Sequence, residues 1–446
     1  MIVINPRFVA AEILVNITKD GMYNNMALKK ALRQNGAMSD TDKAFVTEVV
    51  NGTLRNIFFM DYVINDVSSV KTEKMKPWIL AVLRSAVYQI KFMDVPKRAA
   101  VDEAVKLVKD KGLGKLAGFT NAVLRNIPEH ISFPDEKKEP AEYLEIKYSH
   151  PKWLVRMWIS QFGYDFVKEL CEANGKPADI TVIANRLKTD GRRLEQMLES
   201  NGVNTKKGTY LTDAVHISRT GDISALKGFK DGLFHIQDES SALAVLALGP
   251  KAGENILDIC AAPGGKSLFM AELMDNKGSI TSRDIYEHKL ELIEDSAKRM
   301  GINIIKTELK DASVFYEEDK NKFDRVLVDA PCSGFGLMRK KADIRFNRTG
   351  NDIDGLVKLQ REILSSAGRY VKPGGILVYS TCTICKKENI GNMMWFLESY
   401  GFEPVDLTGA LPKDVCGSTA VNGFVSLFPN IHGTDGFFIS CMRRKG

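Results

Sequence analysis

The second half of the chain alternates short apolar segments with amphipathic ones, and this alternation restricts the fold more than any other feature. Segments with the composition of buried strands include NILDIC, GSITSRDI, INIIKTEL, RVLVDAP and ILVYSTC. Helical patterns such as HKLELIEDSAKRMG and LVKLQREILSSAGRYV lie between them. Strands that alternate with helices build a mainly parallel, doubly wound sheet covered by helices. We therefore predict an α/β Rossmann-like domain over residues 236–446.

The first 132 residues show only the periodicity of amphipathic helices. Ser39 or Asp40 can serve as the N-cap of one such stretch, and Gly112 ends another that begins acidic and finishes basic. A charged, turn-rich run over 133–142 reads as a linker. Residues 145–235 mix helical patterns with strand-like ones. The prediction is a multidomain protein, with an all-α domain over 1–132 and a small α+β domain over 145–235 that precede the α/β domain.

Composition narrows the class of protein. A chain of 446 residues is too long for one core. No apolar run reaches the length of about 18 residues that a membrane span needs, and the N-terminus lacks the pattern of a signal peptide. The seven cysteines are odd in number and scattered, which favours a reducing cytoplasm over a disulfide framework. A net charge of +6 permits an RNA partner without demanding one.

The stretch ILDICAAPGGKS carries the first candidate site. Asp258 and Cys260 end a predicted strand, and small residues then let a ligand approach the start of the next helix. Asp284 ends the following strand, where nucleotide-binding folds place an acid on ribose hydroxyls. Neither G-x-G-x-x-G nor a P-loop is present, so a ligand with a ribose and no phosphate fits better, and S-adenosylmethionine is such a ligand. The alternative is a tight turn without a ligand.

A second stretch, VLVDAPCSGFG, ends a buried strand in Asp329 and exposes Cys332 on a short loop. An acid beside a thiol at the end of a strand is costly unless it has a function. The alternative is a solvated loop with an incidental cysteine.

A third stretch, YSTCTIC, contains Cys382 and Cys385 in a C-x-x-C spacing. A zinc site needs two further ligands at a recognisable spacing, which the chain does not offer, so we expect no metal. A thioredoxin-like pair opens a helix after an early strand of a small domain, unlike this one. Cys385 is best read as a core or helix-start residue, with a second hypothesis that it forms a disulfide with Cys382 under oxidation.

A basic segment follows the second motif, with an aromatic residue among the charges. Such a pattern suits a phosphate backbone and stacked bases, although a charge run is often only a solvated face. The candidate RNA-binding residues are Arg339, Lys340, Lys341, Arg345 and Arg348.

The motifs CAAPGGK, DAPCSG and STC, in this order, resemble those of the NOL/NOP/Sun family of RNA cytosine-5 methyltransferases. Three N-terminal segments, DKAFVTEVVNGTLR, AVDEAVKLVKDKGL and GFTNAVLRNI, resemble the NusB-like RNA-binding domain of the branch that modifies 16S ribosomal RNA. YSHPKWLV, GLFHIQDESS and TDGFF extend the resemblance over essentially the whole chain.

The resemblance implies a role for each candidate residue. Cys382 would attack carbon 6 of the cytosine, Cys332 would help to remove the carbon 5 proton and release the enzyme, and Asp329 would hydrogen-bond the cytosine edge. S-adenosylmethionine would be held by Asp329 and by Cys260, Ala261, Ala262, Pro263, Gly264, Gly265, Lys266, Asp284 and Asp311. Thr383 stands where the family usually has serine, so a hydroxyl is retained.

We accordingly expect a cytoplasmic, monomeric enzyme that methylates carbon 5 of a cytosine in free 16S rRNA or in an assembling small subunit, and so takes part in rRNA processing. The same chemistry on transfer RNA or large-subunit rRNA is the nearest alternative. A non-catalytic RNA-binding assembly or antitermination factor is another, but the full set of motif residues argues against it. A small-molecule methyltransferase would leave the helical domain and the basic segment without a purpose.

Overall fold

The computed structural model describes residues 4–218 and 221–446 and divides the chain into two compact units. The first unit comprises the chain through Lys176 together with Met338–Thr349, and the second comprises Pro177–Leu337 and Gly350–Gly446. Within the described residues, no helix is both long enough and apolar enough to cross a membrane.

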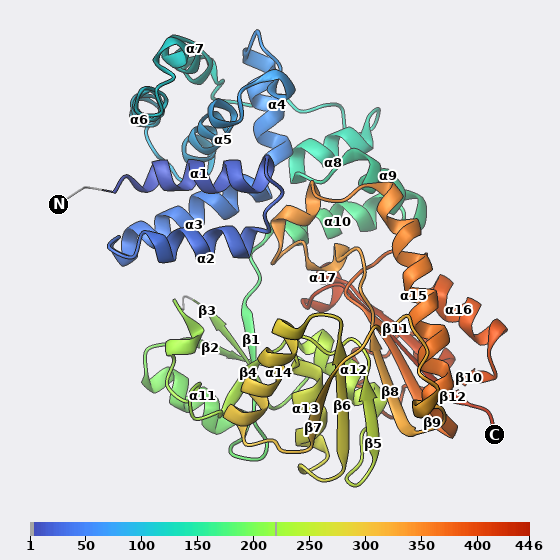
Figure 1. Ribbon diagram of the computed structural model, residues 1–446. Helices are drawn as coiled ribbons and strands as arrows, with labels where there is room; N and C mark the ends of the chain where they lie inside the picture. The colour runs from blue at the N-terminus through green and yellow to red at the C-terminus, as the bar shows by residue number, and fades with distance from the viewer. Residues whose placement is uncertain (1–3, 219–220) are drawn as a thin grey trace. The chain divides into compact units, whose positions relative to one another are not determined.

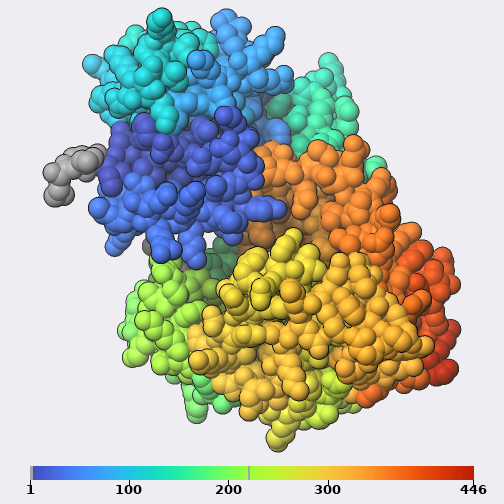
Figure 2. All heavy atoms as spheres, viewed as in Figure 1, coloured from blue at the N-terminus to red at the C-terminus, as the bar shows by residue number. Residues whose placement is uncertain are grey.

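The first unit is helical, as predicted for this part of the chain. Ser39 caps α3, because its side chain accepts a hydrogen bond from the backbone N–H of Asp42 at 3.1 Å. The seven N-terminal helices form one continuous surface, blue to cyan in Figure 2. Their bounds are α1 Pro6–Thr18, α2 Asn24–Gln34, α3 Asp40–Arg55, α4 Ile57–Val67, α5 Pro77–Phe92, α6 Lys97–Asp110 and α7 Ala117–Asn126 (Figure 1).

Three more helices follow in the same unit: α8 (Pro140–Tyr148), α9 (Lys152–Phe162) and α10 (Tyr164–Gly175). The predicted linker over 133–142 therefore ends inside a helix, since Pro140 occupies the first turn of α8, where its missing N–H costs nothing. The compact units divide the chain at Lys176, later than the start of the predicted middle domain at residue 145.

The second unit begins with a four-stranded antiparallel sheet in the order β2-β3-β1-β4, packed on helix α11. Its core joins Val182 of β1, Val215 of β3 and Leu194 of α11. The α+β character predicted for this region is confirmed. The bounds are β1 Ile180–Ala184, α11 Gly191–Ser200, β2 Asn204–Lys207, β3 Ala214–Ser218 and β4 Phe234–Ile236.

The rest of the second unit is built on an eight-stranded sheet in the order β10-β12-β9-β8-β5-β6-β7, with β11 paired to β12. Strands β9, β8, β5, β6 and β7 are parallel, and β10, β11 and β12 are antiparallel additions at one side. The strands are β5 Asn255–Asp258, β6 Ser279–Asp284, β7 Ile305–Leu309, β8 Phe323–Asp329, β9 Val371–Thr381, β10 Phe402–Pro404, β11 Phe424–Leu427 and β12 Phe437–Arg444.

Alternating strand residues enter separate apolar cores. Ile256 packs with residues of α12 and α13, whereas its neighbour Leu257 packs with residues of α15 and α16. The sheet is therefore covered by helices on both faces, as the alternation predicts. The helices are α12 Glu239–Leu248, α13 Gly265–Leu273, α14 Glu287–Met300, α15 Gly350–Tyr370, α16 Ile390–Ser399 and α17 Pro429–His432.

The chain order of this sheet changes direction between β5 and β8. From β5 it proceeds to β6 and β7 on one side, and it then returns to β8 and β9 on the other. Ligands of parallel α/β sheets bind where the order reverses, beyond the carboxyl ends of the strands. The loops that follow β5, β8 and β9 meet at this edge, and these are the loops that carry the three sequence motifs.

Candidate active site

The first loop runs from the end of β5 to the start of α13 and contains Cys260–Lys266. Gly264 has φ +106°, and a β-carbon there would lie 3.1 Å from Cγ1 of Ile293, so the close turn requires glycine. Asp258 is fully buried and accepts a hydrogen bond from Ser267 Oγ at 2.6 Å. Burial raises the pKa of Asp258 to about 7, with the hydrogen bond from Ser267 acting in the opposite direction. Asp258 thus links the end of β5 to the start of α13 and fixes the loop between them.

Asp284 ends β6, next in the sheet, and Asp311 follows β7. The carboxylate of Asp284 accepts from the backbone N–H of Tyr286 at 3.1 Å and lies 3.5 Å from Lys289 Nζ. Asp311 is exposed and accepts from the backbone and hydroxyl of Ser313 at 2.8 and 2.7 Å. The structure therefore places both predicted acids at the carboxyl edge of the sheet, after neighbouring strands.

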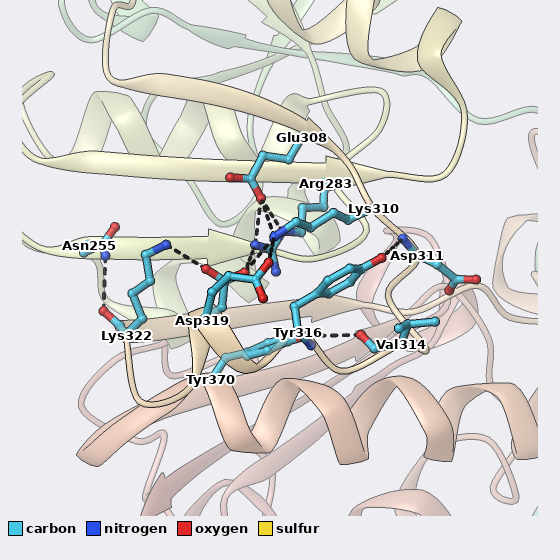
Figure 3. Close-up of polar contacts among 11 residues, drawn as sticks. Asn255, Arg283, Glu308, Lys310, Asp311, Val314, Tyr316, Asp319, Lys322 and Tyr370 are labelled. Carbon is cyan, nitrogen blue, oxygen red and sulfur yellow. Dashed lines mark hydrogen bonds and ion pairs between the residues drawn. The ribbon is translucent and has the colours of Figure 1, made fainter.

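A buried ion network anchors the segment that carries Asp311 (Figure 3). Arg283, only 1% exposed, pairs with Glu308 at 2.7 Å and with Asp319, which Lys310 also contacts at 2.9 Å. Hydrogen bonds from these cations hold the pKa of Asp319 well below its usual range, although burial acts to raise it. A buried charge is stable only when it is paired in this way.

Two tyrosines complete the anchor. Tyr370 donates its hydroxyl to the carbonyl of Val314 at 3.1 Å and accepts from the backbone N–H of Tyr316 at 2.9 Å. Tyr316 in turn accepts from the backbone N–H of Asp311 at 3.3 Å. No local sequence pattern indicates this support, because its members come from four separate segments.

The second and third motifs meet because β8 and β9 are adjacent parallel strands in which Asp329 is paired with Ser380. Cys332 and Cys382 lie just beyond these ends, and their sulfur atoms are 3.2 Å apart. The hydrogen bond to Cys382, burial and nearby acids raise the pKa of Cys332 well above its usual range. The two thiols are thus within hydrogen-bond distance of each other, and either sulfur can be the donor.

Asp329 lies beside the two thiols, and each of its carboxylate oxygens accepts a hydrogen bond. Its Oδ1 accepts from Ser380 Oγ at 2.8 Å and its Oδ2 from Lys266 Nζ at 2.6 Å. Burial lowers the pKa of Lys266, but Asp329 outweighs this effect, and Cys382 contributes in the same direction, so the net shift is upward. Lys266, predicted to hold the cofactor, thus places a positive charge next to the acid and the nucleophile candidate.

Cys385 does not lie at the surface of this site. It is fully buried, and burial together with Glu388 raises its pKa to about 11. Its backbone N–H donates to Thr383 Oγ1 at 3.2 Å, which turns the chain inward after Cys382. Cys332, and not Cys385, is the thiol that the structure places against Cys382. Among the residues that the structure describes, no group of three metal-ligating side chains occurs.

The basic segment belongs to the first unit, and its residues differ in exposure. Lys340 and Lys341 are exposed, and Arg339 and Arg348 are half-buried. Arg345 is fully buried and donates to the carbonyls of Asn174 at 2.8 Å and Met338 at 3.3 Å. Its burial removes Arg345 from the predicted RNA-contacting set, because a guanidinium inside the helical core cannot reach a phosphate.

Sequence reasoning missed Glu388, which is fully buried six residues after Cys382 and accepts hydrogen bonds from both cysteine loops. The sequence pattern around Glu388 does not predict its burial, because an acid before a helical stretch is ordinarily a solvent-exposed residue of the first turn.

Comparison with known proteins agrees with this architecture in each part of the chain. Residues 245–443 match the family model described as 16S rRNA methyltransferase RsmB/F. Residues 4–129 match the NusB family, and residues 150–224 match a RsmF/B-like methyltransferase, ferredoxin-like domain. The three-part fold class predicted above is thereby confirmed, with a ferredoxin-like middle domain.

Relatives extend over the full chain. A probable ribosomal RNA small subunit methyltransferase B of Bacillus subtilis is 40% identical and covers 99% of both chains. The ribosomal RNA small subunit methyltransferase B of Vibrio cholerae is 30% identical over 99% of this chain and 98% of its own. Among solved structures, PH0851 superposes with a TM-score of 0.84 at 29% identity, covering 99% of this chain and all of that one. A methyltransferase homologue from Pyrococcus horikoshii has a TM-score of 0.59 at 28% identity, over 70% of this chain and 100% of its own. The chain therefore belongs to the ribosomal RNA small subunit methyltransferase B family, and it is a methyltransferase.

Proposed function

We propose that the protein transfers a methyl group from S-adenosylmethionine to carbon 5 of a cytosine in 16S ribosomal RNA, through a covalent bond between Cys382 and the base. The observation that carries this proposal is the pair of thiols at 3.2 Å beside the Lys266–Asp329 ion pair. One thiol suffices for nucleophilic attack, and a second beside it has a use when the adduct must also be resolved.

The edge of the sheet fits S-adenosylmethionine. Ile285 follows Asp284 and is 53% exposed, and Val314 follows Asp311 and is 48% exposed. Apolar side chains left in water beside acids, at the ends of neighbouring strands, suit the faces of an adenine and the hydroxyls of its ribose. The turn at Gly264 lets the rest of the molecule approach the backbone. When bound there, S-adenosylmethionine supplies an activated methyl group.

The protein's own groups account for the remaining chemistry. The Cys382 thiolate adds to carbon 6 of the cytosine, the 5,6 double bond opens, and carbon 5 gains the electron density that it needs to take the methyl group. Asp329 hydrogen-bonds the ring edge and holds Lys266, whose charge offsets the negative charge that develops on the ring.

The cycle closes when the carbon 5 proton leaves and the bond between sulfur and carbon 6 breaks. The electron pair of the carbon–hydrogen bond re-forms the 5,6 double bond, and Cys382 departs as a thiolate. Cys332 lies beside that sulfur, and once its own proton has passed to solvent its thiolate accepts the carbon 5 proton. The separation of 3.2 Å between the two sulfur atoms supports this division of labour.

The substrate assignment rests on the relatives and on the first unit. The full-length relatives carry the name ribosomal RNA small subunit methyltransferase B, and residues 4–129 match the NusB family. We propose that the helical unit, with the exposed Lys340 and Lys341, binds the RNA, and that the target base is flipped out or unpaired, because a stacked cytosine hides its ring faces. All seven cysteines are free thiols, which agrees with a cytoplasmic enzyme.

The test is methyl transfer from labelled S-adenosylmethionine to 16S, 23S and transfer RNA, followed by mapping of the modified nucleotide. We expect label on carbon 5 of a cytosine in 16S rRNA. Label on another RNA would contradict the substrate assignment, and absence of transfer to all three would contradict the enzymatic proposal. Cys332→Ala should accumulate a covalent protein–RNA adduct, and the double variant that also lacks Cys382 should form none. An adduct that survives the loss of Cys382 would overturn its role as nucleophile.

A further inference from the structure

A single buried carboxylate connects the two cysteine loops. Glu388 is 0% exposed, and both of its oxygens accept hydrogen bonds. Oε1 accepts from the backbone N–H of Ser333 at 2.8 Å and from Gln360 Nε2 at 3.0 Å. Oε2 accepts from Ser333 Oγ at 2.5 Å and from Thr383 Oγ1 at 3.3 Å. Hydrogen bonds inside the protein thereby compensate the buried charge.

The donors stand directly beside the reacting thiols in the chain. Ser333 follows Cys332 and Thr383 follows Cys382, and the two hydroxyls are 2.8 Å apart. Gln360 of α15 uses its other N–H to bind the carbonyl of Pro331, the residue before Cys332, at 2.9 Å. Both loops are therefore attached to the same carboxylate within one residue of each sulfur.

Glu388 is itself fixed by a second ring of buried groups. Its carbonyl accepts from the hydroxyl of Tyr379 at 2.6 Å, and Asn392 Nδ2 donates to Gln360 Oε1 at 2.8 Å. Asn389 Nδ2 donates to the carbonyl of Thr383 at 2.8 Å. A fully bonded network of this kind is rigid, because each group has one orientation that satisfies its neighbours.

We propose that Glu388 is a positioning residue, which holds the thiols of Cys332 and Cys382 at the separation that the covalent methylation cycle requires. The proposal deepens the function proposed above and rests on it for the chemical roles of the two cysteines, but not for their geometry. An apolar side chain in this position would need no such set of hydrogen bonds, whereas a buried carboxylate is stable only when its charge is compensated. A stability role alone does not explain why both attachment points adjoin the thiols.

Enzyme kinetics distinguish a positioning role of Glu388 from a role in folding alone. Misplacement of reacting groups by about 1 Å costs on the order of 100-fold in rate, so Glu388→Ala should lower kcat by about 10- to 100-fold. The KM for S-adenosylmethionine should stay unchanged, because the side-chain hydrogen bonds of Glu388 join Ser333, Gln360 and Thr383 and not the loop at Gly264, Asp284 or Asp311. Glu388→Gln can still accept from the backbone of Ser333 and donate to the two hydroxyls, so it should restore most of kcat.

The deciding experiment measures the distance between the thiols without RNA or cofactor. Diamide accepts two electrons and two protons from the two thiols, an S–S bond forms, and the azo group becomes a hydrazine. Disulfide formation between Cys332 and Cys382 is followed by peptide mapping in the parent, Glu388→Ala, Glu388→Gln and the control Glu362→Ala, which removes an exposed acid from α15. We expect a rate at least about tenfold lower in Glu388→Ala, because the S–S bond of about 2.05 Å forms only from closely placed thiols. The Gln and Glu362 variants should react at nearly the parental rate.

A parental rate of disulfide formation in Glu388→Ala overturns the proposal, whatever its methylation activity. If the parent protein methylates no RNA, the proposed function is contradicted. Slow disulfide formation in Glu388→Ala would still support the positioning role in that case. Thermal unfolding of each variant verifies folding. If Glu388→Ala does not fold, Ser333→Ala carries the same test, because it removes the hydroxyl that donates to Oε2, and a parental rate in that variant is equally contradictory.

Discussion

The buried pair of Glu272 and His235 yields a prediction about stability and pH. Glu272 lies on α13 and His235 on β4, both almost fully buried, with Oε1 of the acid 3.4 Å from Nδ1 of the imidazole. Burial raises the pKa of Glu272 to about 8, and burial lowers the pKa of His235 to about 4. At neutral pH both groups are therefore uncharged, and the contact is not an ion pair.

The surrounding bonds agree with this assignment. Glu272 Oε2 accepts from the backbone N–H of Arg186 at 3.1 Å, and His235 Nε2 contacts Gln237 Oε1 at 2.8 Å. Among the described residues, neither Glu272 Oε1 nor His235 Nδ1 has a hydrogen-bond partner. A proton on Oε1 would face the ring nitrogen at 3.4 Å, whereas two charged groups without such partners would be costly in this position.

The sign and size of the effect follow from linkage. The native pKa of Glu272 is above its unfolded value, so the native state binds more protons, and stability is full below about pH 4.5 and falls as the pH rises toward 8. Each pKa unit corresponds to about 1.4 kcal/mol, so this group alone should remove about 2.5 kcal/mol between pH 5.5 and 7.5. Glu272→Gln can still accept the hydrogen bond from the backbone N–H of Arg186 and does not titrate, so it should lack this loss.

The assay is urea unfolding of the parent and of Glu272→Gln from pH 5 to 9, with the exposed Glu291→Gln of α14 as control. The difference in unfolding free energy between the parent and Glu272→Gln should change steadily with pH in favour of the variant. The control should follow the parent. Parallel pH profiles for parent and Glu272→Gln would refute the assignment of a protonated acid.

Three further predictions concern the active site. Asp284→Asn should raise the KM for S-adenosylmethionine at least about tenfold with little change in kcat, because a ribose hydrogen bond to a charged group is worth about 1.5–3 kcal/mol. Initial rates at varied cofactor concentration measure the KM, and an unchanged KM would remove Asp284 from the cofactor site. Gly336→Ala should strongly lower kcat, since a β-carbon would lie 1.8 Å from the carbonyl oxygen of Gly436 and would displace the turn in which the backbone N–H of Gly336 itself donates to the carbonyl of Cys382 at 3.0 Å. Crosslinking of the thiols by diamide should slow in parallel, and a parental rate in both assays would contradict the reasoning. Cys385→Ser should leave methyl transfer as sensitive to peroxide as in the parent, because Cys332 is the thiol beside Cys382, and peroxide resistance in this variant would instead support the Cys382–Cys385 disulfide.

Much of the fold followed from patterns that act over short distances. Alternation of apolar strands and amphipathic helices requires a parallel sheet with helices on both faces, whatever the rest of the chain does. The N-cap at Ser39 is equally local, because the hydroxyl and the N–H that it binds are three residues apart. The division at Lys176 was not visible, since a helix carries no sign of the unit that will bury its apolar face.

The sequence by itself determined the candidate residues for the site, since a thiol, an acid and a glycine turn are recognisable by type and by their place after apolar strands. Only the tertiary structure decided their partners. The register of β8 against β9 brings Cys332 to Cys382, and the turn after β9 buries Cys385, although Cys385 is the nearer thiol in sequence. Partners such as Lys266 with Asp329 are 63 residues apart, and their pairing depends on strand order, which no local pattern specifies.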